Sequence, residues 1–161
     1  MKTIRPRPLT PAEFAPFGDV IDTRGQPDMV INQGQCGRYH DRAQLDFADG
    51  RAGISLFVAT PRSLPYRLEM VERHPLGSQT FIPMTHQPFL VIVAPDEAGT
   101  PGAPRAFLTE PGQAVSYHRG TWHGVLTPLH APGLFAVVDR IGPGENLQEY
   151  WFDTPWIVEA P

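Results

Sequence analysis

Two short segments of the chain contain side chains that could bind a metal ion or move protons. The first segment spaces a carboxylate, an imidazole and a carboxamide as Glu-x-His-x4-Gln, at Glu72, His74 and Gln79. Side chains two residues apart on a strand point to the same face, so Glu72 and His74 can reach into one cavity. Gln79 can return to that cavity if residues 75–77, Pro-Leu-Gly, form a turn.

The second segment, residues 112–123, places His118 and His123 on either side of Gly120. A neutral imidazole suits both metal binding and proton transfer near pH 7. The alternative is that one of the two histidines only packs against the turn. Both are therefore candidates for a place in the same site as the first segment.

Two interpretations of these side chains remain open. In the first, a divalent metal ion with free coordination positions is held by Glu72, His74, Gln79 and His123. One carboxylate and two imidazoles also compose the ligand set of non-haem iron oxygenases, so this interpretation includes an oxygenase. In the second, the same side chains bind substrate by hydrogen bonds without a metal, because glutamine is a weak metal ligand. The candidate catalytic residues are Glu72, His118 and His123.

Residues outside these segments could bind an anionic substrate. Arg38 and His40 belong to a run, Arg-Tyr-His-Asp, that lies outside any apolar stretch, and Arg140 follows an apolar strand. Guanidinium groups bind carboxylates through two parallel hydrogen bonds. Arg38, His40 and Arg140 are therefore candidate substrate-binding residues. The alternative for the first run is a solvated loop with a local Arg–Asp pair.

The composition argues against several classes of partner. The 161 residues suffice for one domain, residues 1–161, and a net charge of −4 without basic runs argues against nucleic acid or an acidic membrane surface. No apolar run reaches membrane-spanning length, and the N-terminus lacks the apolar core of a signal peptide. The single cysteine, Cys36, cannot form an internal disulfide. We therefore expect a cytoplasmic protein that acts on a small molecule.

Nineteen prolines and fifteen glycines punctuate short apolar segments along the chain. Such punctuation is typical of short strands joined by turns, so we predict an all-β sandwich or barrel that binds ligand at its mouth. The expected strands cover residues 54–59, 66–73, 80–83, 89–94, 105–108, 114–117 and 134–139, with a surface loop at 95–104. Thr10-Pro11-Ala12-Glu13 indicates the capping box of one short N-terminal helix.

The chain resembles the ureidoglycolate lyase family of the cupin superfamily. The run Glu-Arg-His-Pro-Leu-Gly-Ser-Gln at residues 72–79 is the most specific match. The other matching runs are Phe17–Ile21, Arg38–Asp41, Phe81–Met84, Tyr117–His123 and Asp139–Arg140. The resemblance spans roughly Pro8 to Arg140 and is weakest toward the C-terminus.

This resemblance implies a cupin double-stranded β-helix, also called a jelly-roll barrel, and a homodimer. The implied reaction cleaves (S)-ureidoglycolate, a small anion, to glyoxylate and urea during allantoin and purine breakdown. A divalent metal is implied, with nickel the ion usually named, and no organic cofactor. His123 matches the histidine ligand of the second cupin motif, whereas His118 stands where that motif usually has proline. The alternatives are a metal-dependent cupin dioxygenase and a cupin that binds small molecules without catalysis.

Overall fold

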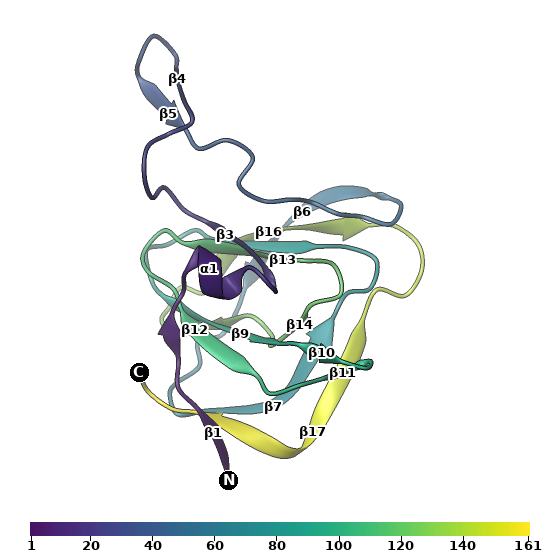
Figure 1. Ribbon diagram of the computed structural model, residues 1–161. Helices are drawn as coiled ribbons and strands as arrows, with labels where there is room; N and C mark the ends of the chain where they lie inside the picture. The colour runs from purple at the N-terminus through teal and green to yellow at the C-terminus, as the bar shows by residue number, and fades with distance from the viewer.

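Two β-sheets face each other and enclose an apolar interior (Figure 1). The computed structural model describes all of residues 1–161. Nearly all regular structure is strand, and helix is limited to one short turn. This arrangement confirms the predicted all-β class and is consistent with a cupin barrel.

The larger sheet has eight strands. Its strands are β1 (Lys2–Ile4), β2 (Arg7–Pro8), β7 (Tyr66–Arg73), β9 (Phe89–Ala94), β12 (Arg105–Leu108), β14 (Trp122–His123), β15 (Thr127–Pro128) and β17 (Gln148–Val158). The order is β1-β17-β7-β14-β9-β12-β2, and β15 also pairs with β9. The edge strands β1 and β2 run parallel to their neighbours, and the other pairs are antiparallel.

The smaller sheet has five antiparallel strands in the order β3-β13-β8-β16-β6. Their bounds are β3 (Gly18–Ile21), β6 (Arg51–Val58), β8 (Gln79–Pro83), β13 (Ala114–Tyr117) and β16 (Leu134–Ile141). Two hairpins complete the fold: β4 (Met29–Ile31) with β5 (Cys36–Arg38), and β10 (Asp96–Glu97) with β11 (Thr100–Pro101).

The interior between the sheets is filled by aromatic and β-branched side chains. Strand β9 shows the pattern, because all six of its residues are buried and its two faces contribute to different clusters. Phe89, Val91 and Val93 enter the barrel interior, whereas Leu90, Ile92 and Ala94 join a second cluster on the other face. Burial on both faces explains why this strand is one continuous apolar run in the sequence.

The helix α1 (Pro11–Phe14) closes one end of the barrel with the buried side chain of Phe14. As the capping box predicted, Thr10 is the N-cap, and its hydroxyl accepts a hydrogen bond from the Glu13 amide at 3.3 Å. The reciprocal half of the box is not formed, because the Glu13 carboxylate instead accepts a hydrogen bond from Arg7 at 2.8 Å.

Three features differ from the sequence prediction. Residues 95–104, expected to be a loop, contain the short β10–β11 hairpin. The longest strand, β17, was not predicted; it contains Pro155 and changes register between Trp151 and Trp156, so its alternation is broken. The β4–β5 hairpin projects away from the barrel (Figure 1). No helix of the structure is long and apolar enough to cross a bilayer.

Candidate active site

The polar residues of the site occupy neighbouring positions across both sheets. In the larger sheet, His123 on β14 lies directly opposite Glu72 on β7. In the smaller sheet, Gln79 on β8 lies between Tyr117 on β13 and Asp139 on β16. Directly opposed residues project to the same face of a sheet, so each sheet presents one row of polar side chains. The stacked rings of Tyr117 and His123 join the two rows.

Glu72, His74 and His123 form the centre of this site. Each of the three offers one possible ligand atom, and these atoms lie within 4.8 Å of one another. Nε2 of His74 is 4.0 Å from a carboxylate oxygen of Glu72. The ring centroids of the two histidines are 5.2 Å apart. A carboxylate and two imidazoles therefore meet at one point.

Backbone carbonyls fix the tautomer of both histidines. Nδ1 of His74 lies 2.7 Å from the carbonyl oxygen of Asn146, and Nδ1 of His123 lies 2.9 Å from that of Gly124. A carbonyl only accepts hydrogen bonds, so each Nδ1 carries the proton and each Nε2 keeps its lone pair. Metal-binding histidines are usually held in this way.

Gln79 adds a third free lone pair. Its Nε2 donates a hydrogen bond to Asp139 at 3.2 Å, which leaves its Oε1 without a partner. The buried side-chain atoms without a partner are Nε2 of His74, Oε1 of Gln79 and Nε2 of His123. An unpaired buried polar atom costs about 1–3 kcal/mol. The two imidazole acceptors beside the Glu72 carboxylate suit a divalent cation, and Gln79 is linked to them through Tyr117, which pairs with Gln79 and stacks on His123.

Burial shifts the protonation of the site. It raises the pKa of the Glu72 carboxyl; the charge of Glu149 on the neighbouring strand adds to that shift, and His74 opposes it. Burial, with a smaller effect of His74, lowers the pKa of His123 to about 3. His123 is thus neutral at physiological pH, with its lone pair available.

Tyr117 was not among the predicted site residues. Its ring stacks on that of His123, with centroids 4.3 Å apart and an angle of 2° between the planes. Burial, together with the charge of Glu72, raises the pKa of its hydroxyl well above the usual value. Tyr117 therefore holds the imidazole plane and remains a neutral hydrogen-bond donor. The inward alternation of β13 was the one signal that could have pointed to it.

Residues 75–77, Pro-Leu-Gly, form the predicted turn between β7 and β8. A side chain at Gly77 would lie 2.8 Å from Cβ of Arg140, so only glycine fits there. The amide of Leu76 donates to the Asn146 side chain at 2.7 Å, and Arg119 donates to the Pro75 carbonyl at 2.6 Å. Asn146 therefore supports both the turn and His74, and no sequence pattern had marked it.

The structure does not bring His118 into this cluster. The residue follows Tyr117 and points outward, where its Nε2 lies 3.9 Å from Asp19. Its side chain is 44% exposed, and it lines outer hollows together with Arg119. The sequence had placed it near the ligands because a turn separates it from His123. Strand alternation in the folded chain separates the two side chains.

Arg38 and His40 also lie away from the cluster. Both are exposed and stand on or just after the projecting β4–β5 hairpin (Figure 1). Asp28 accepts hydrogen bonds from the His40 amide and from Arg42, both at 2.8 Å. An Arg–Asp pair thus lies beside this run, but it joins Arg42 to Asp28 and not Arg38 to Asp41.

Arg140 is close to the site turn, but its guanidinium is already occupied. It donates to the carbonyl of Asp49 and to that of Pro143, both at 2.7 Å, and also to the Asp49 carboxylate. Its side chain is 1% exposed. Arg140 thus ties two loops together beside Gly77, and the predicted substrate contact would require these bonds to break.

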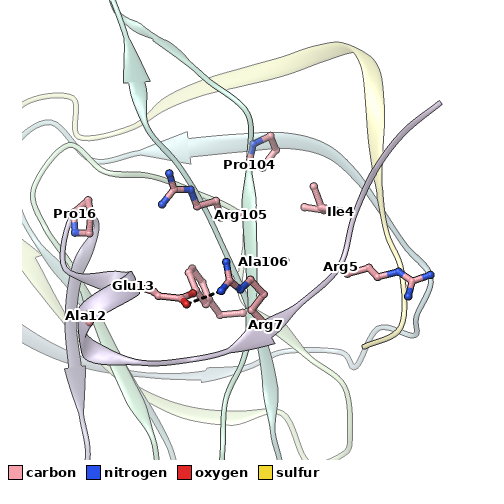
Figure 2. A pocket seen from close by; sticks show the side chains of 10 residues that line it. Ile4, Arg5, Arg7, Ala12, Glu13, Pro16, Pro104, Arg105 and Ala106 are labelled. Atoms are coloured by element: carbon pink, nitrogen blue, oxygen red, sulfur yellow. Dashed lines mark hydrogen bonds and ion pairs between the residues drawn. The ribbon is translucent and has the colours of Figure 1, made fainter.

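A separate hollow of about 450 Å³ lies on the outer surface between the N-terminal segment and β12 (Figure 2). Three arginines line it, but Arg7 pairs with Glu13 and Arg5 pairs with Glu159, each at 2.8 Å. Only Arg105 has no carboxylate partner, and its guanidinium lies over the Phe17 ring. Two of its three arginines are therefore already neutralised by carboxylates.

Fold and site together define a β-barrel of the cupin type with a histidine–carboxylate centre. The chain matches the ureidoglycolate lyase family over residues 1–159, and it belongs to that family. It is 61% identical to the ureidoglycolate lyase of Rhodobacter capsulatus over 161 residues, which cover 99% of this chain and 100% of that protein. It is 50% identical to the ureidoglycolate lyase of Chelativorans sp., covering 100% and 99% of the two chains. It is 52% identical to ureidoglycolate lyase 2 of Rhizobium meliloti, covering 95% of each.

Proposed function

We propose that this protein is a ureidoglycolate lyase, a carbon–nitrogen lyase that cleaves (S)-ureidoglycolate to glyoxylate and urea. The observation that carries the proposal is the meeting of the Glu72 carboxylate with two imidazoles, His74 and His123, whose Nε2 lone pairs are buried and without a partner. Family membership and the names of the relatives support the same reaction. The reaction belongs to the breakdown of allantoin and hence of purines.

Cleavage of ureidoglycolate requires few catalytic groups. The substrate hydroxyl loses its proton, the carbon–nitrogen bond breaks as the aldehyde forms, and the departing urea nitrogen gains a proton. No water is consumed and no electrons leave the substrate. A base within hydrogen-bonding distance of the hydroxyl is therefore the first requirement. A carboxyl with a raised pKa, such as Glu72, suits that role because it holds a proton more readily near neutral pH.

We further propose that a divalent metal ion, nickel by family resemblance, is held by Glu72, His74, Gln79 and His123. When bound, the ion supplies positive charge that stabilises negative charge on the substrate oxygens. The residues themselves orient the ligand atoms, since each histidine is fixed through Nδ1 and Gln79 through Asp139. Tyr117 keeps the His123 ring in place and offers a donor. Glu72 is the base if the metal proves dispensable.

The remaining predicted roles follow from this assignment. His118 points away from the cluster, so we assign it no proton transfer at the reacting atoms. Arg38 and His40 would need a neighbouring molecule to bring them near a site, and Arg140 acts through the turn. An oxygenase needs a redox-active metal and oxygen, and the names of the relatives favour the lyase over it.

We also propose that the chain, acting as one domain, forms a homodimer in the cytoplasm. The outer face of the smaller sheet supports the dimer, because its edge strand β6 exposes Ile54, Leu56 and Val58 at 78%, 64% and 80%. Leu56, Ala136 and Ile82 lie side by side on three adjacent strands, so the apolar face is continuous. Exposed apolar faces of this kind commonly mark subunit interfaces. Light scattering should give twice the chain mass, and a Leu56→Glu variant should give the mass of one chain.

Turnover of racemic ureidoglycolate by chelator-treated protein, with and without added nickel or manganese, tests the function. Equal amounts of glyoxylate and urea without ammonia are expected, with the rate restored by the metal. Turnover that stays unchanged after complete metal removal would overturn the metal assignment. Absence of turnover with every metal would overturn the lyase assignment.

A further inference from the structure

Asp139 is an unusual neighbour for the site. It lies on β16 directly opposite Gln79, and it is only partly exposed. No arginine, lysine or histidine lies within ion-pair distance of its carboxylate. Its one side-chain partner is Gln79, whose Nε2 donates to Oδ2 at 3.2 Å. A partly buried carboxylate without a cation is costly, so its position here calls for a role.

The carboxylate determines which way the carboxamide of Gln79 points. A carboxylate only accepts hydrogen bonds, whereas a carboxamide has a donating end and an accepting end. In the observed orientation, the NH2 group faces Asp139 and Oε1 is buried without a partner. In the reverse orientation, Oε1 would face the carboxylate oxygen, and the lone pair would be lost from the site.

We propose that Asp139 is a positioning residue that holds the carboxamide oxygen of Gln79 toward the ion at His74 and His123. This inference rests on the proposed metal site. It also supplies the neutral glutamine with a nearby negative charge, because the carboxylate that orients the amide lies on the adjacent strand β16. A preoriented neutral ligand loses less freedom on binding than a free one.

The test measures Mn²⁺ affinity by calorimetry for the wild-type protein and for Asp139→Leu, Asp139→Asn and Gln79→Leu. Loss of a group that orients a ligand typically weakens metal binding by about 10–100-fold, which we expect for Asp139→Leu. Asp139→Asn should lose far less affinity, because its carbonyl oxygen can still accept from Gln79. Equal losses in the two variants would overturn the orienting role, since only the charge would then matter.

The double variant Gln79→Leu/Asp139→Leu tests whether Asp139 acts through Gln79. If Asp139 acts through Gln79, Asp139→Leu should cause no further loss of Mn²⁺ affinity in the Gln79→Leu background. An equal loss in both backgrounds would overturn the proposal. If Asp139→Leu does not fold, as judged by thermal unfolding, Asp139→Ala replaces it in the same cycle.

A second readout separates this inference from the metal assignment. If wild-type protein binds no Mn²⁺, the metal assignment fails, and the side-chain amide protons of Gln79 then decide the orientation by NMR. Slow exchange of these protons in wild type, and fast exchange in Asp139→Leu, would support the orienting hydrogen bond. Equal exchange rates in the two proteins would overturn it.

Discussion

The two ends of the barrel interior are built from the same strands but differ in chemistry. At one end, Phe81 of β8 and Val137 of β16 are buried in an apolar cluster that α1 closes with Phe14. Two residues earlier on β8 and two residues later on β16, the same inward face carries Gln79 and Asp139. A shift of two positions along a strand thus changes packing into a ligand site.

The apolar end stabilises the fold, whereas the polar end provides the candidate site. Each buried apolar side chain at the closed end contributes about 1.5–3 kcal/mol to folding. At the other end, three buried acceptors lack partners, which opposes folding until a ligand satisfies them. The closed end therefore offsets the cost of a site that is kept ready for a cation.

The largest expected effect comes from breaking the polar end at its carboxylate. Glu72→Gln should lower kcat by about 10²–10⁴-fold, because an amide neither accepts the substrate proton nor carries charge. The free energy of unfolding should stay equal or rise, since a costly buried charge is removed. Steady-state release of glyoxylate and urea denaturation measure the two effects. Glu149→Gln is the matched control, and an equal loss of kcat in that exposed neighbour would contradict the assignment.

Breaking the apolar end should give the opposite result. Phe14→Ala is expected to lower the free energy of unfolding by about 3–5 kcal/mol, through lost burial and the cavity that remains. The Phe14 ring lies 6.2 Å from that of Tyr117 and does not reach the histidines, so the loss of stability should far exceed any change in the KM for ureidoglycolate. Urea denaturation and kinetics at low temperature check both values. A large increase in KM with unchanged stability would show that the two ends are not separable.

A smaller effect is expected on the pH dependence of the free energy of unfolding of the metal-free protein. His123 has a pKa of about 3 when folded and about 6.5 when unfolded, so below pH 6.5 the unfolded chain binds a proton that the folded chain does not. Stability should therefore fall as the pH is lowered from 6.5 toward 3, by up to about 1 kcal/mol per pH unit. Glu72 acts in the opposite sense, because its raised pKa makes protonation favour the folded state.

Chemical denaturation at several pH values, with chelator present, measures this slope. A His123→Asn variant removes the titrating group and should show a shallower dependence between pH 6.5 and 3. If the unfolding free energy changes with pH equally in both proteins, His123 is not held neutral by burial. The polar end would then differ less from the apolar end than the structure indicates.

Several features of this protein were determined by the sequence alone. The alternation of Glu72 and His74 and the Pro-Leu-Gly turn before Gln79 are local patterns; in the structure Glu72 and His74 lie together, and Gln79 pairs with Tyr117 after the turn. Most strands and the Thr10 cap could likewise be predicted, because periodicity and capping act over a few residues. The family could also be recognised, since the run at residues 72–79 is specific.

The tertiary structure decided what no local pattern contains. Strand pairing placed Tyr117 and Asp139 beside Gln79, although β13 and β16 are distant from β8 in sequence. It also turned His118 outward and enclosed Arg140 between two loops. Whether a polar side chain becomes a ligand or a structural contact depends on which acceptors and donors surround it after folding. Strand register across the two sheets determines these neighbouring groups, and register depends on long-range packing of the core.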